Sequence, residues 1–288
     1  MRVHLVDGTF ELFRAHFSPR PGKAVGGVDI KATAGLLGSM LALLDDPAEA
    51  VTHLAIAFDN PIRSFRNDLF AGYKGDEGVP TSLRAQFDLV EEAVRAVGIT
   101  VWSMDRWEAD DALATGATRF VSNDVQVRIL TPDKDLGQVL DGERVVQVDR
   151  MRKKVIDEAS MRARRGIAPA SIPDWLGLVG DTADGIPGLA GFGEKSAALL
   201  LAYYGTIEAI PDDDRNWAVK VTGAPRLAAT LAAGRPDALL YKKLASLVRD
   251  VPLAESLDDL RYRGAERAAY AALCEKLELM PRWTAFRA

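Results

Sequence analysis

The chain has 288 residues, of which 48% are hydrophobic and 27% are charged, and its formal net charge is −5. These values are typical of a soluble globular protein with one large domain, or a main domain and a smaller one, and they argue against a disordered chain. The single cysteine, Cys274, excludes an intrachain disulfide, and the presence of only three histidines argues against a zinc site. No apolar run approaches 18 residues and no signal peptide opens the sequence, so we expect a cytoplasmic protein that binds no membrane.

Short apolar runs alternate with amphipathic segments in the first half of the chain. The runs at 2–6, 54–58, 99–102, 127–131 and 145–148 are predicted strands, and the segments at 32–44, 82–97 and 108–121 are predicted helices. This alternation predicts an α/β fold with a mostly parallel central sheet flanked by helices. Three strands lead directly into aspartates, namely Asp7, Asp59 and the pair Asp133 and Asp135. Because ligands bind at the carboxyl ends of parallel strands, these aspartates predict a shared site.

Three carboxylates, Glu108, Asp110 and Asp111, open the helix predicted at 108–121. Acidic residues in a first helical turn can simply favour the helix dipole, and for this segment in isolation that interpretation is the ordinary one. Six further aspartates favour a metal site over this interpretation. They include two closely spaced pairs, Asp133 with Asp135 and Asp181 with Asp184. So much negative charge in one place predicts a bound cation.

All-oxygen ligation without histidine or cysteine favours Mg²⁺ or Mn²⁺. Two such ions about 4 Å apart can activate a water and stabilise the leaving oxygen in phosphodiester hydrolysis. Setting the nine proposed ligands aside leaves 32 acidic residues against 36 basic ones, so the remainder of the chain is mildly basic. A nucleic-acid partner is therefore compatible with the negative net charge.

The segment 60–81 contains no convincing strand but carries basic and aromatic side chains among glycines, including Arg63, Arg66, Tyr73 and Lys74. An insertion over the mouth of the site would have this composition, and so would a solvated loop. The two interpretations remain open on composition alone.

A basic run and a glycine-rich segment follow the predicted sheet. Residues 144–165 contain eight lysines or arginines, and 180–198 is rich in glycine and leads into a predicted helix. A P-loop is disfavoured because Glu194 separates Gly193 from Lys195, and a dinucleotide fingerprint is disfavoured because Pro187, rather than a strand, precedes it. A glycine hairpin between two helices instead suits non-specific binding of a nucleic-acid backbone through free N–H groups. The remainder, 198–288, has a helical pattern interrupted by prolines.

Together these motifs resemble the 5′ nucleases, the family that comprises the 5′→3′ exonuclease domain of DNA polymerase I, the bacteriophage 5′ exonucleases and the flap endonucleases. The resemblance rests on Leu-Val-Asp-Gly at 5–8, Phe-Asp-Asn at 58–60, Glu-Ala-Asp-Asp at 108–111, Pro-Asp-Lys-Asp-Leu at 132–136, Gly-Asp-Thr-Ala-Asp-Gly-Ile-Pro-Gly at 180–188 and Gly-Phe-Gly-Glu-Lys-Ser-Ala at 191–197. It covers nearly the whole chain and implies a PIN-like nuclease core.

The resemblance implies two metal-binding groups and two DNA-binding regions. Asp7, Asp59, Glu108, Asp110 and Asp111 would surround one ion, and Asp133, Asp135, Asp181 and Asp184 would serve the second. The predicted DNA-binding residues are Arg66, Tyr73, Lys74, Gly188, Gly191, Gly193, Lys195 and Ser196. Of these, Tyr73 and Lys74 would lie in a helical arch, with Lys74 facing the scissile phosphate as a catalytic residue. A helix-three-turn-helix at about 174–205 would hold duplex DNA, with a bound K⁺.

The predicted domains are an α/β nuclease core at 1–165, including the arch at about 60–105, and a helical DNA-binding region at 166–288. Three positions depart from the family pattern: Glu77 stands where a basic residue is usual, Gly185 replaces Asn, and Trp107 replaces Tyr. No polymerase domain follows residue 288, so the chain is either a standalone enzyme or an excised domain.

The predicted function is structure-specific 5′ nuclease activity on DNA with 5′ ends, flaps or nicks, carried out by a monomer. A catalytically weak protein that binds branched DNA or RNA is the alternative, because Glu77 weakens phosphate contact in the arch. A PIN-type ribonuclease is a third possibility, but the small domains of that type lack the glycine hairpin.

Overall fold

The computed structural model describes residues 1–281, so the last seven residues of the predicted helical region, 282–288, lie outside the described part. The chain forms two compact units. Unit 1 comprises Met1–Ser64, Asp76–Thr131 and the chain from Arg249, and unit 2 comprises Phe65–Gly75 and Pro132–Val248. Within the described residues no helix combines the length and the apolar character needed to cross a membrane.

Unit 1 is built on four parallel strands in the order β5 (Thr100–Met104), β4 (His53–Asp59), β1 (Arg2–Asp7) and β6 (Gln126–Leu130). All four were predicted from their apolar runs, and β1 in particular is buried from Val3 to Asp7. Leu5 lies level with Ala55 on one neighbouring strand and with Ile129 on the other. This register places the carboxyl ends of β1, β4 and β6 at one edge, as the parallel sheet requires.

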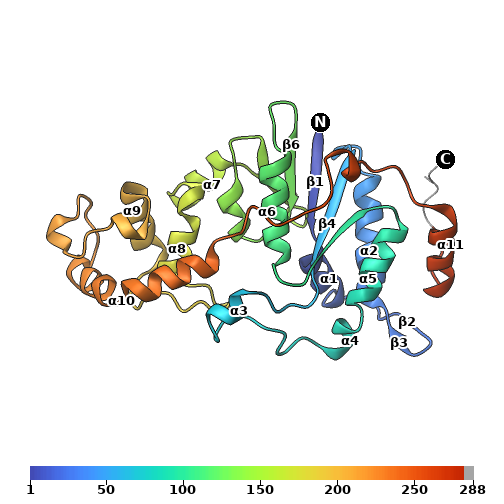
Figure 1. The fold of residues 1–288 in the computed structure, drawn as a ribbon, viewed down its shortest axis with the longest axis horizontal. Helices are drawn as coiled ribbons and strands as arrows, with labels where there is room; N and C mark the ends of the chain where they lie inside the picture. Colours follow the sequence, from blue (N-terminus) through green and yellow to red (C-terminus); the bar gives the residue numbers. More distant parts are fainter. Residues whose placement is uncertain (282–288) are drawn as a thin grey trace. The chain divides into compact units, whose positions relative to one another are not determined.

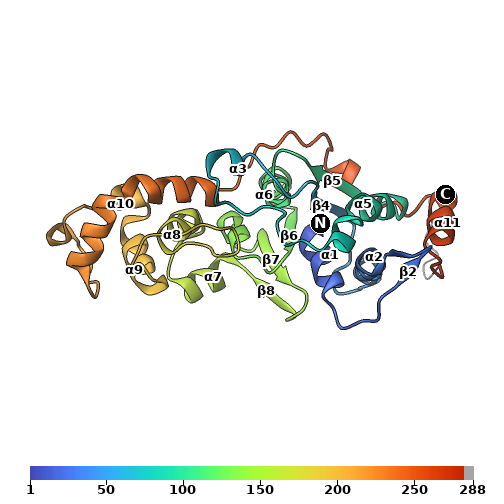
Figure 2. The same cartoon turned by 90° about the horizontal axis from the view of Figure 1, so that it is seen from below.

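Helices cover both faces of this sheet. In Figure 2, α6 (Ala109–Phe120) lies on one face, and α1 (Gly8–His16) and α2 (Lys31–Leu44) lie on the other. The short hairpin β2 (Ala24–Val25) and β3 (Val28–Asp29) precedes α2, and α11 (Arg267–Lys276) packs against α5 (Phe87–Ala96) (Figure 1).

The helix predicted at 82–97 is interrupted. Two helices, α4 (Thr81–Arg84) and α5, replace it, because Gln86 between them is fully buried and its side-chain oxygen accepts hydrogen bonds from the backbone N–H and the hydroxyl of Thr33, at 3.0 and 3.1 Å. The helix α1 was not predicted. It starts at Gly8, where a Cβ atom would lie 2.6 Å from the carbonyl oxygen of Ala57, so only glycine permits this close turn.

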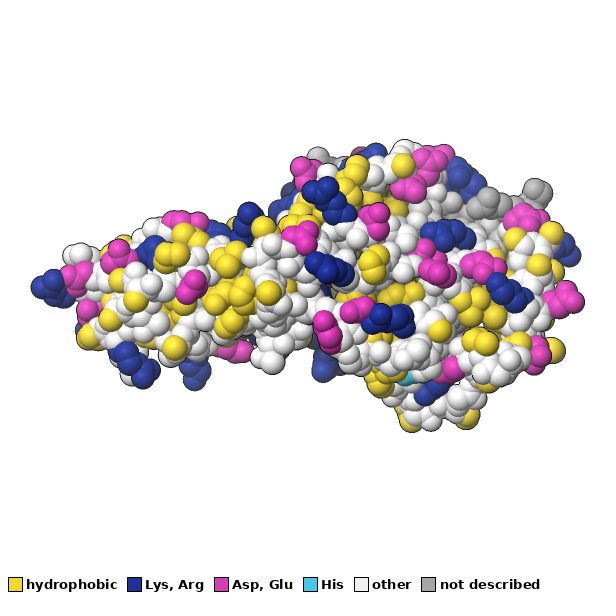
Figure 3. Space-filling view, turned by 60° about the horizontal axis from the view of Figure 1, so that its bottom comes forward, with side chains coloured by type: hydrophobic (Ala, Val, Ile, Leu, Met, Phe, Trp, Pro, Cys, Tyr) yellow, Lys and Arg dark blue, Asp and Glu magenta, His cyan; other side chains and the backbone are white. Residues whose placement is uncertain are grey.

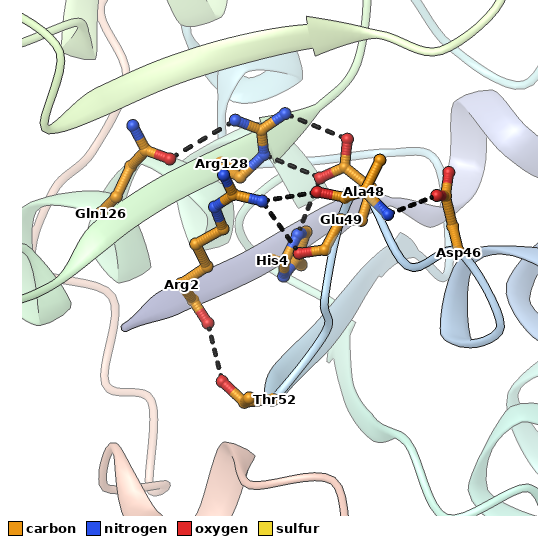
Figure 4. Close-up of polar contacts among 8 residues, drawn as sticks. All are labelled: Arg2, His4, Asp46, Ala48, Glu49, Thr52, Gln126 and Arg128. Atoms are coloured by element: carbon orange, nitrogen blue, oxygen red, sulfur yellow. Dashed lines mark hydrogen bonds and ion pairs between the residues drawn. The ribbon is translucent and has the colours of Figure 1, made fainter.

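A buried polar network occupies the amino-terminal end of the unit 1 sheet (Figure 4). Arg128 of β6 donates from Nε and Nη2 to the carboxylate of Glu49, at 2.8 and 3.0 Å, and His4 Nε2 of β1 lies 3.0 Å from the same carboxylate. Burial raises the pKa of Glu49, but its hydrogen bonds with Arg128 and His4 outweigh that effect and hold the pKa below its ordinary value. Burial, together with the charges of Arg128 and Arg2, holds the pKa of His4 below its ordinary value although Glu49 raises it.

Unit 2 is mainly helical. It contains the antiparallel pair β7 (Val145–Asp149) and β8 (Lys154–Ile156) and the helices α3 (Arg66–Leu69), α7 (Glu158–Arg165), α8 (Ile172–Val179), α9 (Glu194–Tyr204) and α10 (Ala224–Ala245). The helices α8 and α10 pack closely at Gly177, where a Cβ atom would lie 2.8 Å from the carbonyl oxygen of Ala238. The helix α10 continues through Pro236, so the predicted interruption there is wrong.

The predicted helical arch is not formed as a long helical segment. Between residues 60 and 80 the only α-helix is the four-residue α3, and the rest consists of turns and irregular backbone. The remainder of the predicted range 60–105 is occupied by α4, α5 and β5, which belong to the helix and sheet layers of unit 1. The glycine-rich composition of this segment explains why it does not sustain helix.

Candidate metal centre and nucleic-acid interface

Asp7 and Asp59 lie at the carboxyl ends of β1 and β4, as predicted. Asp7 caps α1 by accepting from the backbone N–H of Phe10 at 2.8 Å, and its other oxygen accepts from the hydroxyl of Thr131 at 2.9 Å. Asp59 accepts from the backbone N–H of Ala109, the first residue of α6, at 2.8 Å. Both carboxylates are therefore positioned by helix starts.

The segment from Glu108 to Asp111 forms the first turn of α6. Glu108 is buried and accepts from the hydroxyl of Ser64 at 2.7 Å, while Asp111 is fully buried and accepts from the backbone N–H of Glu108 at 3.0 Å. Asp110 is half-buried. The bond between Asp111 and Glu108 is a capping interaction at the start of α6.

The structure does not gather the five carboxylates of unit 1 into one tight cluster. Among residues 1–281, the only group of three such side chains whose ligand atoms lie within 4.8 Å of one another belongs to unit 2. The assignment of Asp7, Asp59, Glu108, Asp110 and Asp111 to a metal ion therefore stays a prediction.

Asp135, Asp181 and Asp184 form that cluster in unit 2. Asp135 stands at the start of a 3₁₀ helix and is 5% exposed, and its Oδ1 atom is buried with no hydrogen-bond partner. An orphaned buried carboxylate oxygen costs free energy unless a cation or a proton satisfies it. Burial and the nearby charges of Asp133, Asp184 and Asp181 raise the pKa of Asp135 well above its ordinary value. The donor set thus fits a hard divalent cation, which prefers carboxylate oxygens.

Asp133, the fourth predicted ligand of this group, is exposed and lies outside the cluster. Its carboxylate accepts from the backbone N–H of Asp135 at 2.8 Å and so shapes the turn that presents Asp135. It also adds negative charge beside the buried carboxyl.

Two lysines pair with the cluster. Lys74 Nζ lies 2.8 Å from Asp184, and Lys134 Nζ lies 2.5 Å from Asp181. Burial lowers the pKa of Lys134, but its hydrogen bond to Asp181 and the charge of Asp135 outweigh that effect and raise the pKa above its ordinary value. Lys134 was not among the predicted site residues. Its position between Asp133 and Asp135 is the sequence signal that could have indicated it.

The loop that carries Asp181 and Asp184 is held by backbone contacts. Asp181 and Ile186 exchange two backbone hydrogen bonds of 2.8 Å, and Lys74 N–H donates to the carbonyl of Asp184 at 2.9 Å. Gly185 has φ +71°, and a Cβ atom on it would lie 2.1 Å from the carbonyl oxygen of Gly72. Glycine at this position, one of the departures from the family pattern, is thus required by the close approach of the segment that carries Lys74.

Arg66 and Tyr73 do not occupy DNA-accessible positions. Arg66 is 1% exposed, and its guanidinium donates to the carbonyls of Leu244 and Ser246 at 2.8 and 2.9 Å. Tyr73 is 6% exposed and belongs to the hydrophobic core of unit 2. A side chain buried in this way offers no surface to a phosphate, so the structure argues against both predicted DNA contacts.

The predicted helix-three-turn-helix corresponds to α8, α9 and the glycine-rich loop between them. Gly188 and Gly191 have positive φ values of 68° and 86°, which allow the tight turns. Gly193 caps α9, where its N–H donates to the hydroxyl of Ser196 at 3.0 Å. Within the described residues no hydrogen bond or ion pair holds the exposed side chain of Lys195. A free ammonium at a helix N-terminus suits a phosphate.

Charge over the visible face in Figure 3 is mixed. Basic and acidic side chains are interspersed there, and no large field of one sign is present. This face therefore gives no indication of an extended electrostatic footprint for a polyanion.

Family models match the chain in two parts. Residues 2–166 match the 5′-3′ exonuclease N-terminal resolvase-like domain, and residues 167–268 match the 5′-3′ exonuclease C-terminal SAM fold. The chain is 30% identical over 278 residues to a 5′-3′ exonuclease of Aquifex aeolicus (strain VF5), covering 96% of this chain and 92% of that protein.

A longer relative is DNA polymerase I of Bacillus caldotenax, which is 34% identical over 282 residues. The match covers 96% of this chain and 31% of the polymerase, so the chain spans about a third of that relative's length. Among solved structures, the bacteriophage T5 D15 flap endonuclease, determined with DNA and metal ions, has a TM-score of 0.63 at 16% identity and covers 96% of this chain and 100% of its own. This similarity concerns the fold alone. The two family models and the Aquifex relative establish that the chain belongs to the 5′-3′ exonuclease family.

Proposed function

We propose that the chain is a divalent-metal-dependent, structure-specific 5′ nuclease that acts as a monomer on DNA with 5′ ends, flaps or nicks. The observation that carries the proposal is the cluster in which Asp135, with its orphaned carboxylate oxygen, meets Asp181 and Asp184 of the loop that leads into the glycine hairpin. Hard-oxygen ligation favours Mg²⁺ or Mn²⁺ in this group. The DNA in the T5 D15 complex supports DNA as the substrate.

When bound, the ions would supply an activated water and charge stabilisation for the leaving oxygen. The cluster of unit 2 would hold one ion, and Asp7, Asp59, Glu108, Asp110 and Asp111 would hold the other. The family resemblance adds K⁺ beside the hairpin of Gly188, Gly191, Gly193, Lys195 and Ser196, which would bind the duplex backbone.

The residues of unit 2 have separate tasks in this proposal. Asp135, buried and unsatisfied at one oxygen, anchors the cation, while Asp181 and Asp184 close the group from the loop. Lys74 and Lys134 neutralise these carboxylates while no cation is bound. Once released, Lys74 would face the scissile phosphate, as the resemblance implies, and its charge would stabilise the transition state.

Digestion of 5′-labelled nicked, flapped and single-stranded DNA, with and without Mg²⁺, tests the proposal. We expect Mg²⁺-dependent cleavage that Asp135→Asn abolishes, while neutralising the exposed Asp237 of α10 leaves cleavage intact. Binding of flapped DNA without cleavage at any Mg²⁺ or Mn²⁺ concentration would instead support the alternative, a catalytically weak protein that binds branched nucleic acid.

A further inference from the structure

A cavity of about 760 Å³ lies in unit 2 beside the aspartate cluster. Its walls come from the turn after Pro132, the strands β7 and β8, and the helices α7, α8 and α9. Asp181 belongs both to this lining and to the cluster. The cavity therefore opens next to the proposed metal centre and has the size of a small-molecule site.

The lining is strongly basic. Its five cationic side chains outnumber the two acidic ones, Asp181 and Glu194. The five are Lys134, Arg152, Arg164, Arg165 and Lys195. Concave placement of like charges raises the local electrostatic potential and costs folding free energy, so an anion is the ligand that the lining fits.

Three of the five cations are already engaged. Lys134 pairs with Asp181 and Arg152 with Asp149, at 2.5 and 2.9 Å, and the guanidinium of Arg165 lies 4.8 Å from the ring centroid of Trp175. In residues 1–281 no hydrogen bond or ion pair holds Arg164 or Lys195, both of which are exposed. These two side chains can donate to a ligand without breaking an existing contact.

Apolar side chains complete the cavity. Ile156, Met161, Val179 and Ala198 lie in the lining with Trp175. The guanidinium of Arg165 lies over this aromatic ring, and burial lowers its pKa. Nucleobases pack on apolar surfaces and on arginine planes of this kind. A free inorganic anion would leave this apolar surface without a contact.

We propose that this cavity binds a nucleotide carrying a 5′-phosphomonoester, with its phosphate on Arg164 and Lys195 and its base against the apolar wall. The inference rests on the proposed function for the origin of the nucleotide, which is either the mononucleotide released by exonucleolytic cleavage or the 5′-phosphorylated end of a strand. Both sources present the same dianion, and both lie close to a cluster that would hold the metal.

Isothermal titration of the intact chain with 2′-deoxyadenosine 5′-monophosphate in EDTA tests binding without cleavage. We expect saturable one-to-one binding, and none with deoxyadenosine, which lacks the phosphate. Arg164→Gln should weaken binding roughly tenfold, the usual effect of losing a charge-assisted hydrogen bond. The matched control is Arg162→Gln on the same helix, because Arg162 is outside the lining and pairs with Glu158 at 2.8 Å.

Absence of saturable binding, or equal weakening by the two substitutions, would overturn the proposal. Trinucleotides with 5′-phosphate and 5′-hydroxyl ends distinguish the sources. Preference for the phosphorylated trinucleotide identifies the strand end, while equal trinucleotide binding with retained mononucleotide binding identifies the free product. Cleavage of DNA by a chain that binds no mononucleotide refutes only the cavity, and mononucleotide binding by a chain that cuts no DNA refutes only the nuclease.

Discussion

Replacing Lys134 by methionine should make the protein less stable without metal and make it bind Mg²⁺ more tightly. The lysine ammonium lies 2.5 Å from Asp181, so it neutralises a carboxylate of the aspartate cluster when no cation is present. A divalent ion must displace this ammonium or share the carboxylate with it. Methionine has a similar length and no charge, so the substitution removes the competitor and keeps most of the packing.

The magnitude follows from the spacing of the charges. The ligand atoms of the three carboxylates lie within 4.8 Å of one another, and two unit charges at that separation repel by about 3.5 kcal/mol at an effective dielectric constant of about 20. The ammonium of Lys134 offsets part of this repulsion through its ion pair with Asp181. Because the side chain of Lys134 is 35% exposed, solvent screening limits the net contribution of that ion pair to about 1 kcal/mol. This corresponds to Mg²⁺ binding roughly fivefold tighter in Lys134→Met and to a melting temperature in EDTA lower by about 2–4 °C.

Thermal melting in EDTA and across a Mg²⁺ titration measures both effects. The matched control is Lys195→Met, which removes a lysine of the same unit that has no ion pair among the described residues. The control should leave the Mg²⁺-dependent rise in melting temperature unchanged. An equal rise in Lys134→Met and the parent chain would refute the competition between lysine and metal.

Three further outcomes can be measured independently. Gly185→Ala should destabilise the chain by about 2–4 kcal/mol in urea titrations, because it combines positive φ with a 2.1 Å approach to Gly72, while Gly38→Ala, in open space on α2, should be neutral or stabilising. Lys195→Ala should reduce the slope of log affinity for duplex DNA against log salt concentration by about one unit, and an unchanged slope would remove this lysine from the interface. The folded-state pKa values of His4 and Glu49 are both lowered, so at these two sites the unfolded chain binds more protons and their contribution to stability is lost as the pH drops below 6.5. Comparison of urea titrations across pH should show that His4→Gln loses less stability than the parent chain between pH 6.5 and the lowered pKa of His4, and identical losses would refute this contribution.

The parallel sheet of unit 1 was predictable because its strands are continuous apolar runs. Val3, Leu54 and Val127 each lie in a run whose residues are buried on both faces, and such runs leave few alternatives to a covered parallel strand. The break between α4 and α5 was not predictable, since the amphipathic pattern continues across it. It depends on the buried hydrogen bonds between Gln86 and Thr33, which are far apart in sequence.

The aspartates were found because three strands lead into them, but their local roles required the structure. Asp111 forms a capping interaction within its own helix, and Asp133 shapes a turn, although their spacing alone is equally compatible with metal ligation. Asp135 differs in having a buried oxygen with no partner. Spacing therefore identified the acidic group, and burial distinguishes the residue with an unsatisfied oxygen.

The basic residues were harder to assign because a long cationic side chain can donate hydrogen bonds to acceptors anywhere in the chain. Arg66 was predicted to contact DNA, yet its donors reach carbonyls 178 and 180 residues away, which no local pattern could indicate. Arg164 belongs to a basic run whose ordinary interpretation is a solvated face. The cavity separates it from Arg162, because only one of these two arginines of the same helix lines a concave surface beside the cluster. What distinguishes Arg164 is thus a neighbouring cavity together with the absence of an internal acceptor among residues 1–281, and both properties arise only from tertiary packing.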